Sequence, residues 1–458
     1  MTGSTVCERL VDFVVDWSRR GVPADVAHEA VRLLLNQLKA SVGATDHPAV
    51  RKLYEWAVET DAAVGVQRGS AHTLWFGTAT TPAHAAIVNG ALFEVLDFND
   101  TYIPTFMHAT SGVLPAVLAV AEAGGNSGSE VIDALALGLE VELAVATILM
   151  PTGYYRGFVP GGLCGGVGAA TACAVLGRLD PVRMRNAIGL AMCTAFGTYE
   201  SVGSMALPFI MGLTARSGLT AFELAARGFD APATAFEGEK GMLASYSDES
   251  TTKIEAVLAS LGTTWRIHGQ SYKTVPTETI THAPIECVLA LRTGAGTRRV
   301  ERMRFSVQPI VVKIADERRE RFGDPTSELT ARFDLRYCAA AAWHAGRFTL
   351  DEMRETAYTN ARILDLRSRV DLVADENRTT FDGCSLQIEY TDGSIESVSV
   401  DAFLGSPGRR MTDAELSEVF RAAAIMLPPG RADAILSQIW DLRSAPSIHA
   451  LIALARLS

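Results

Sequence analysis

Apolar residues recur at helical spacing almost without interruption from about residue 5 to residue 260, and this pattern limits the possible folds more than any other feature. Pro23 opens one such segment, PADVAHEAVRLLLNQLKASVG. Five of its apolar residues fall on one helical face: Ala27, Ala30, Val31, Leu34 and Leu38. Ser127 and Glu130 have capping-box spacing and predict another helix that runs to about residue 150. The first half of the chain is therefore predicted to be helical.

Two acidic residues, Glu140 and Glu142, interrupt the most apolar long segment, ALALGLEVELAVATILM. A membrane span would exclude both acids, so this segment is predicted to be a buried helix of a bundle. One of the two is expected to pair with an arginine such as Arg156 or Arg216. Glycine and alanine are abundant between residues 161 and 228, and such small residues allow helices to approach closely.

The pattern changes near Trp265. The segment RMRFSVQPIVVKIA alternates like a strand, and three apolar residues share one side: Met303, Phe305 and Val307. The segment SLQIEYTDGSIESVSV predicts a β-hairpin, with Leu386, Ile388 and Tyr390 before a Thr-Asp-Gly turn. TARFDLRYCAAAAWHAG between them is helical, and helical spacing returns after about residue 402.

A chain of 458 residues is too long for one hydrophobic core, so more than one domain is expected. The fold class is predicted to be mainly α with an α+β second domain. Residues 1–267 and 401–458, from both chain ends, form a large all-helical domain in this prediction. Residues 268–400 form an inserted, smaller α/β lid domain.

The net charge of −11 argues against a nucleic-acid partner and an anionic membrane surface, because both require a cationic face. A small-molecule substrate is expected instead. The N-terminal segment MTGSTVCERLVDF lacks the pattern of a signal peptide. The seven cysteines are scattered and never spaced as CxxC, which is typical of a reducing compartment. A cytoplasmic location is therefore expected.

The densest polar cluster lies in NGALFEVLDFNDTYIPTFMHATSGVLP, between two predicted helices. It holds Asp97, Asn99, Asp100, Thr101 and His108. Two carboxylates, a hydroxyl and an imidazole on one loop are suited to general acid–base chemistry. Helix capping is the alternative interpretation, because Asp, Asn and Thr are preferred at helix ends.

This cluster resembles the MmgE/PrpD family, the 2-methylcitrate dehydratase and aconitate decarboxylase group, which reads roughly NGxxxHxLDFDDT at this place. Asp97, Asp100 and Thr101 match that pattern, and His108 matches after one extra residue. Further similar segments follow in the family's order over almost the whole chain: VPADVAHEAVRLLLNQLKASVG, RGFVPGGLCGGVGAATACAVLGRLD, ARSGLTAFELAARGFDAPATAFEGEKGM, YKTVPTETITHAPIECVLAL and GSPGRRMTDAELSEVF.

The resemblance implies a homodimer whose cleft lies between the helical domain and the lid and which works without a metal or organic cofactor. It also implies lyase chemistry, the loss of water or carbon dioxide from polycarboxylates, with an epimerase branch. Independently of the resemblance, the chain has no HxxxH or HExxH spacing. The glycine-rich GGLCGGVGAA lies in helical surroundings, which argues against a dinucleotide loop.

Carried over by position, the resemblance places Asp97, Asp100, Thr101 and His108 on the catalytic side of the helical domain. His108 is the expected proton-transfer group, because an imidazole titrates near neutral pH. Asp97 shares the acid–base role, and Asp100 and Thr101 contact the substrate.

Three further residues follow from the same resemblance. Lys273 is the expected carboxylate anchor at the domain junction. His282 lies beside it, either against the substrate or as a buried histidine of the core. Tyr337 enters from the lid, as a catalytic donor or as a wall of the pocket.

The chain departs from the family at four positions, and at three of them a group able to bind a carboxylate or move a proton is replaced by an aliphatic side chain. Val159 in RGFVPGG stands where the family carries a histidine, and Gly161 stands at the neighbouring threonine. Leu207 and Ile210 in LPFIMG replace a lysine and a histidine. These changes remove about two potential positive charges, and burying an uncompensated carboxylate costs several kcal/mol. A substrate less anionic than methylcitrate or cis-aconitate is therefore expected.

Three functions are compatible with these residues. A cofactor-independent lyase is preferred. An isomerase or epimerase that removes and returns one proton needs fewer cationic anchors. A non-catalytic binding protein that kept the fold is the third alternative.

Overall fold

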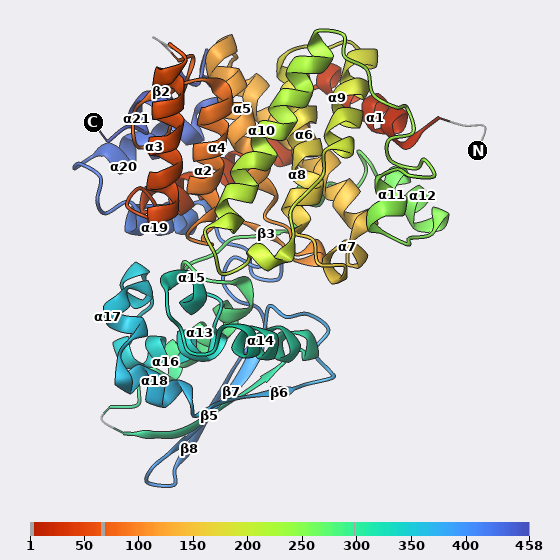
Figure 1. Cartoon of the computed structure of the whole chain (residues 1–458). Helices are drawn as coiled ribbons and strands as arrows, with labels where there is room; N and C mark the ends of the chain where they lie inside the picture. Colours follow the sequence, from red (N-terminus) through yellow and green to blue (C-terminus); the bar gives the residue numbers. More distant parts are fainter. Residues whose placement is uncertain (1–3, 66–68, 297, 458) are drawn as a thin grey trace. The chain divides into compact units, whose positions relative to one another are not determined.

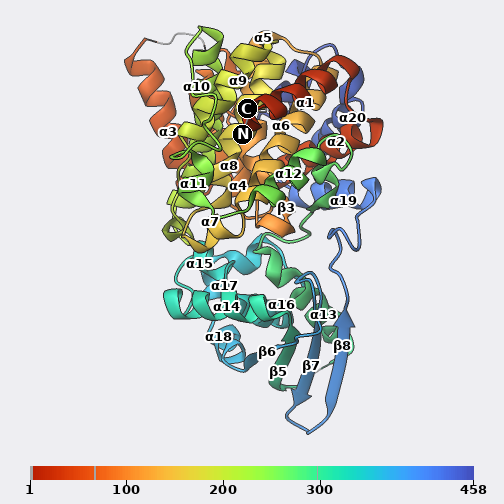
Figure 2. The same ribbon diagram turned by 90° about the vertical axis from the view of Figure 1, so that its right-hand side faces the viewer.

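The computed structural model describes residues 4–65, 69–296 and 298–457. The protein is mainly helical, as predicted, and has one small mixed sheet in its C-terminal half. The chain separates into two compact units, Met1–Gln270 with Thr412–Ser458 and Ser271–Met411 (Figures 1 and 2). The sequence had placed the corresponding division at residues 268 and 400.

The first unit contains fifteen α-helices among its described residues. They are α1 (Val6–Arg20), α2 (Ala24–Val42), α3 (Pro48–Ala63), α4 (Pro82–Glu94), α5 (Ala109–Gly124), α6 (Gly128–Leu149), α7 (Thr152–Tyr155), α8 (Pro160–Leu176), α9 (Pro181–Cys193), α10 (Ala206–Ala226), α11 (Met242–Tyr246), α12 (Thr251–Ala259), α19 (Asp413–Ala423), α20 (Arg431–Trp440) and α21 (His449–Leu454). Short elements join them: β1 (Ala71–His72), β2 (Ala79–Thr80), β3 (Thr101–Tyr102), β4 (Gln270–Ser271), and the 3₁₀ turns η1 (Ile103–Thr105), η2 (Tyr199–Ser201), η3 (Arg266–Gly269) and η6 (Leu442–Ser444).

Glycines bring the central helices of this unit into backbone contact. A methyl group on Gly212 of α10 would lie 2.2 Å from the carbonyl oxygen of Ile87 in α4. A methyl group on Gly138 of α6 would lie 2.7 Å from the carbonyl oxygen of Gly168 in α8. Figure 1 shows α4, α10 and α8 side by side in this arrangement. The small residues between 161 and 228 therefore have the packing role that their composition indicates.

Of two local predictions for the helices of the first unit, one is confirmed and one is too narrow. The capping box of Ser127 and Glu130 is present at the start of α6, which confirms that helix. The single apolar face predicted for α2 is too narrow, because residues 33–42 are all buried. The C-terminal half of α2 is enclosed because it packs against several helices from both ends of the chain, α4, α5, α6, α19 and α20.

Glu140 of α6 pairs with an arginine, although not with either of the two that were suggested. The Arg266 guanidinium donates to Glu140 Oε1 at 2.6 Å, and the Arg266 backbone N–H donates to Oε2 at 2.7 Å. Arg156 pairs instead with Asp248. Burial raises the pKa of Glu140 to about 7 in spite of the arginine. Among the described helices, none combines the length and the apolar character that a membrane crossing requires.

The second unit is built on a four-stranded sheet with the strand order β6-β5-β7-β8. Its strands are β5 (Val300–Val307), β6 (Val370–Ala374), β7 (Cys384–Tyr390) and β8 (Ile395–Val400), and only the β5–β6 pair is parallel. Its helices are α13 (His282–Arg292), α14 (Pro309–Phe322), α15 (Glu328–Ala331), α16 (Leu335–Ala345), α17 (Glu355–Tyr358) and α18 (Ala361–Arg367), with the 3₁₀ turns η4 (Thr279–Thr281) and η5 (Leu350–Met353).

The predicted strand face and hairpin are both present in this sheet. Met303, Phe305 and Val307 of β5 are at most 1% exposed. Leu386 of β7 pairs with Val398 of β8, which confirms the hairpin. The strand-like reading of PIVVKIA is wrong, because α14 begins at Pro309, whose missing N–H is not needed in a first helical turn.

Candidate active site

The loop between α4 and α5 bends through two residues in the left-handed backbone region. Asp97 has φ of 47° and Phe106 has φ of 54°. Such conformations are uncommon for residues other than glycine, and they persist where the surrounding structure enforces them. The Asp97 N–H donates to the Glu94 carbonyl at 2.8 Å, and the Tyr102 N–H donates to the Met107 carbonyl at 2.8 Å. The loop therefore has a fixed shape.

One ring nitrogen of His108 is committed to the backbone of this loop. Nδ1 lies 2.7 Å from the carbonyl oxygen of Asp100 and 3.2 Å from Thr101 Oγ1. A carbonyl oxygen can only accept a hydrogen bond, so Nδ1 carries the proton in the neutral ring. Nε2 is then the basic nitrogen.

The basic nitrogen of His108 faces the carboxylate of Asp97, with Nε2 and Oδ1 3.7 Å apart. The His108 side chain is 26% exposed and that of Asp97 is 6% exposed. A buried carboxylate at this distance stabilises the imidazolium that forms when Nε2 accepts a proton. The pair has the geometry of a general base that a second residue supports.

Helices α2 and α5 hold the loop from its buried side. Gln37 Nε2 donates to Asp100 Oδ1, and the Thr110 N–H donates to Oδ2 at 3.4 Å. Asp100 is fully buried, and burial raises the pKa of its carboxyl, while these hydrogen bonds act to lower it. Asp100 thus supports the loop from within the bundle.

Two other buried contacts surround the same loop. Asn99 Nδ2 donates to Glu94 Oε2 and to Ser111 Oγ, both at 2.7 Å. The Lys39 ammonium lies 3.8 Å from the centre of the Phe98 ring. The sequence had indicated Asn99 as part of the polar cluster, but not Glu94, Ser111 or Lys39. Those three are polar residues within helices, where no local pattern separates a site from an ordinary helix.

Two of the departures from the family pattern lie together at one turn. The Val159 N–H, at the start of α8, donates to the Gly197 carbonyl at 3.0 Å. Ile210 Cγ2 would lie 3.2 Å from a methyl group on Gly197. Both side chains are buried, and Leu207 in the first turn of α10 is half-buried. Val159 and Ile210 therefore lie together at residue 197.

Three aromatic residues that the sequence did not indicate connect the loop to this turn. The rings of Phe106 and Tyr154 have centroids 5.2 Å apart. The Tyr154 hydroxyl donates to the Tyr199 hydroxyl at 3.1 Å, and the Tyr199 N–H donates to the Gly157 carbonyl at 2.7 Å. They come from three separate segments, so only the fold reveals that they are neighbours.

Lys273, His282 and Tyr337 belong to the second unit, and all three are at most 1% exposed there. The His282 ring lies 5.2 Å from that of Phe403. The Tyr337 hydroxyl donates to the backbone carbonyl of Glu352, and burial raises its pKa. Because that hydrogen is engaged, the contacts of Tyr337 favour a structural role over proton donation.

Within the described residues, no three His, Cys, Asp or Glu side chains come together as a metal-binding group. The four residues of the first unit that the sequence grouped do come together: Asp97, Asp100, Thr101 and His108. Three of them surround the imidazole of His108. The Asp97 carboxylate faces Nε2, while the Thr101 hydroxyl and the backbone carbonyl of Asp100 lie at Nδ1.

Comparison with known proteins covers both units. A model of the MmgE/PrpD N-terminal domain matches residues 8–255, and a model of the MmgE/PrpD C-terminal domain matches residues 275–442. The human cis-aconitate decarboxylase is 26% identical over 82% of this chain and 79% of its own length. The cis-aconitate decarboxylase of Aspergillus terreus is 25% identical over 84% of this chain and 82% of its own length.

A third relative, the cis-aconitate decarboxylase-like protein oryM of Aspergillus oryzae, is 23% identical over 98% of this chain and 97% of its own length. The family models together cover most of the sequence, and the three relatives align along 82%, 84% and 98% of it. The chain belongs to the MmgE/PrpD family.

Proposed function

We propose that this protein is a cofactor-independent lyase acting on a small carboxylate-bearing molecule, with His108 as the proton-transfer group. The observation that carries the proposal is the orientation of the imidazole. Its Nδ1 is held by the Asp100 carbonyl, which directs Nε2 to the Asp97 carboxylate while a quarter of the side chain stays exposed. The family relationship supports the reaction class, because its curated relatives are cis-aconitate decarboxylases.

Both lyase reactions can use this pair. In a dehydration, Nε2 removes a proton from the carbon beside a carboxylate and passes it to the hydroxyl on the next carbon, which leaves as water. In a decarboxylation, the carbon–carbon bond breaks and carbon dioxide leaves, and Nε2, protonated beforehand from the solvent, donates its proton to the resulting carbanion. Asp97 stabilises the charged imidazole in both reactions.

We further propose that the substrate carries fewer negative charges than cis-aconitate. Val159, Leu207 and Ile210 supply no positive charge, and Phe106, Tyr154 and Tyr199 extend the same side with aromatic rings. An additional carboxylate without a cation costs several kcal/mol of desolvation. We expect kcat/KM for the less charged substrate to exceed that for the tricarboxylate by about a hundredfold. This ratio corresponds to a difference of about 2.7 kcal/mol in activation free energy.

Lys273 and His282 are retained in the proposal as substrate-binding residues of the second unit. An ammonium group is the natural anchor for the one carboxylate that the substrate keeps. Replacing Lys273 with Met keeps the length of the side chain and removes the charge. It should raise KM more than it lowers kcat, because the anchor binds the substrate and the transition state alike.

The experiment is a comparison of cis-aconitate and 2-methylcitrate with a series of monocarboxylates and dicarboxylates, read by product mass in D₂O. Loss of water or carbon dioxide from a substrate with one or two carboxylates is expected. Ordinary turnover of cis-aconitate would contradict the reduced-charge proposal, while lyase activity would still stand.

Two alternatives give different results in the same assay. An epimerase conserves mass and incorporates one deuterium, because it removes and returns a proton. The Nε2–Asp97 pair is also compatible with that reaction. A binding protein changes neither mass nor isotope content.

A further inference from the structure

Glu142 of α6 is the most unusual buried acid of the first unit. Its side chain is 0% exposed. Neither carboxyl oxygen has a hydrogen-bond partner among the described residues. Glu140, two residues away, is equally buried but has its arginine. Buried polar groups are nearly always paired, so an acid in this condition requires an explanation.

The helices around Glu142 leave it close to the loop of the candidate site. A methyl group on Gly165 of α8 would lie 3.2 Å from Glu142 Oε1 and 3.7 Å from the Cα atom of Gly112. Gly112 is in the first turn of α5, two residues after Thr110, whose N–H binds Asp100. The Thr214 hydroxyl of α10 is also buried, and it too lacks a partner among the described residues.

An acid on the loop, Asp100, acts on Glu142. Burial in the first place, and the charge of Asp100 in the second, raise the pKa of Glu142 well above its usual range. Cys164 faces it from α8 as a buried thiol. The one acid of α5, Glu122, pairs with His72, and Arg216 of α10 lines an outer groove.

We propose that Glu142 is a positioning residue of this site, a protonated acid beneath Asp100 that keeps the loop in the shape that orients His108. If Glu142 ionised, a second negative charge would stand beside Asp100 in a medium that screens it weakly. The repulsion would act on the residue whose carbonyl holds His108 Nδ1. The role assigned to His108 rests on the proposed function, whereas the proton on Glu142 does not.

The test compares the wild type with Glu142→Gln, which keeps the shape and cannot ionise. Glu418→Gln on the surface of α19, 71% exposed, is the matched control. Denaturant midpoints are measured at several pH values. The native wild type holds a proton that the unfolded chain releases above the ordinary pKa of glutamate, so its stability falls as pH rises through that window. The fall should be smaller in Glu142→Gln, where Glu140 and Asp100 still contribute their share, and unchanged in Glu418→Gln.

A second measurement separates positioning from mere stability. The histidine ring signals are followed by NMR with carbon-13 labelling, and the His108 signal is identified by its absence in His108→Ala. The His108 signal of the wild type should shift at the upper end of the pH range where stability falls, because native Glu142 itself loses its proton there, and this shift should be absent in Glu142→Gln.

Parallel stability curves for the wild type and Glu142→Gln would overturn the proposal, and so would a His108 signal that moves identically in both. Should Glu142→Gln fail to fold, infrared spectroscopy of the wild type decides the matter. A carbonyl band of a protonated buried carboxyl must then be present near neutral pH, and its absence refutes the proposal. No readout uses a substrate, so a failure of the lyase assay is distinguishable from a failure here.

Discussion

The two nitrogens of His108 have unequal surroundings, and this inequality determines what the residue can do. Nδ1 binds a backbone carbonyl, an acceptor that no side-chain substitution removes. Nε2 faces a carboxylate at 3.7 Å, and the two groups attract each other when the ring is protonated. The protein thus fixes the tautomer through its backbone and places a carboxylate beside the nitrogen that is free to accept a proton.

The first prediction concerns this pair. His108→Ala should lower kcat by about 100- to 10,000-fold, the usual contribution of a general base. Asp97→Asn should lower it less, by about 10- to 100-fold, because the base remains and only the support of its charged form is lost. His344→Ala, at an exposed position of α16, should have no effect. Steady-state kinetics on the substrate found by the proposed assay would measure all three, and full activity in His108→Ala would refute the assignment.

The second prediction concerns Tyr337. Its hydroxyl donates to a backbone carbonyl inside the second unit, so Tyr337→Phe should lose one buried hydrogen bond. We expect a loss of about 1–3 kcal/mol in unfolding free energy, because the Glu352 carbonyl remains without this donor, and activity within about twofold of the wild type. A large fall in kcat with unchanged stability would restore the catalytic role that the family resemblance suggests.

At the level of helices and strands, the sequence was most informative where local chemistry decides the structure. The hairpin of β7 and β8 and the capping box of α6 follow from turn residues and short-range spacing. The start of α14 was missed, although its buried residues, Val311, Ile314, Ala315 and Arg318, follow helical spacing. The preceding strand and the β-branched run after Pro309 produced the error.

In the candidate site, too, the residues that one local motif contains could be predicted, and those that come from distant segments could not. One loop carries Asp97, Thr101 and His108, so a single sequence motif contains the group. Phe106, Tyr154 and Tyr199 come from three separate segments of the chain. The residues around Glu142 come from four segments. No spacing along the sequence therefore reveals that the members of either group are neighbours. Long-range packing is the information that local patterns lack.

The third prediction concerns the contact between α4 and α10. Gly212→Ala would place a methyl group 2.2 Å from the Ile87 carbonyl, so the helices must separate. A loss of about 1–3 kcal/mol in unfolding free energy is expected from such overpacking. Gly166→Ala in α8 is the control, because its methyl group would have nothing closer than 3.8 Å. That variant should be neutral or gain about 0.5–1 kcal/mol, since alanine is the better helix former. Equal effects in chemical denaturation would contradict the packing argument.

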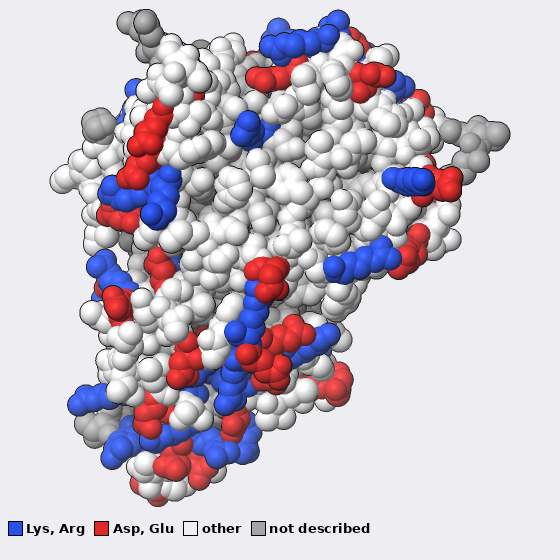
Figure 3. Space-filling view, viewed as in Figure 1, with Lys and Arg blue, Asp and Glu red and all other residues white. Residues whose placement is uncertain are grey.

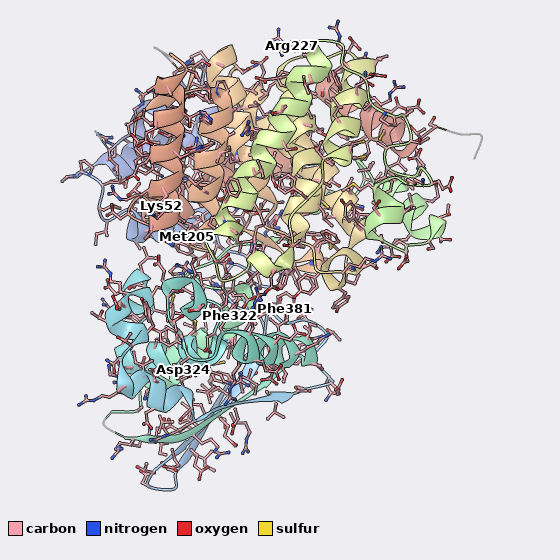
Figure 4. All side chains as sticks on the ribbon, viewed as in Figure 1. Lys52, Met205, Arg227, Phe322, Asp324 and Phe381 are labelled. Atoms are coloured by element: carbon pink, nitrogen blue, oxygen red, sulfur yellow. The ribbon has the colours of Figure 1, made fainter. Side chains whose placement is uncertain are left out.

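At the scale of the whole molecule, the distribution of charge on the first unit is uneven. Figure 3 shows a face over α4, α10 and α8 that is nearly free of charged side chains. Met205, Phe209 and Leu224, all in or beside α10, are 43%, 38% and 37% exposed. Figure 4 labels Met205 and Arg227 at the two ends of this helix. A groove of about 290 Å³ between α9 and α10 is lined mainly by apolar residues such as Leu190, Phe196 and Leu213.

A large uncharged face with exposed apolar side chains is typical of an interface between proteins. The family resemblance implies a homodimer, and we propose a second copy of this chain as the occupant. A twofold axis through α10 would place the same apolar residues of both copies against each other, as a self-complementary interface requires. The repulsion expected of a chain with net charge −11 is least at such a face.

The fourth prediction follows from this proposal. The 49.0 kDa chain should sediment with about twice its own mass. Phe209→Glu together with Leu224→Glu would bury charges without partners at the interface, so this variant should sediment as a monomer at concentrations where the wild type is dimeric. Ile425→Glu, between α19 and α20, is the control, because that side chain is 88% exposed and lies off this face. It should leave the mass unchanged. A dimer that survives the double substitution would place the interface elsewhere, and a wild type that sediments as a monomer would reject the homodimer itself.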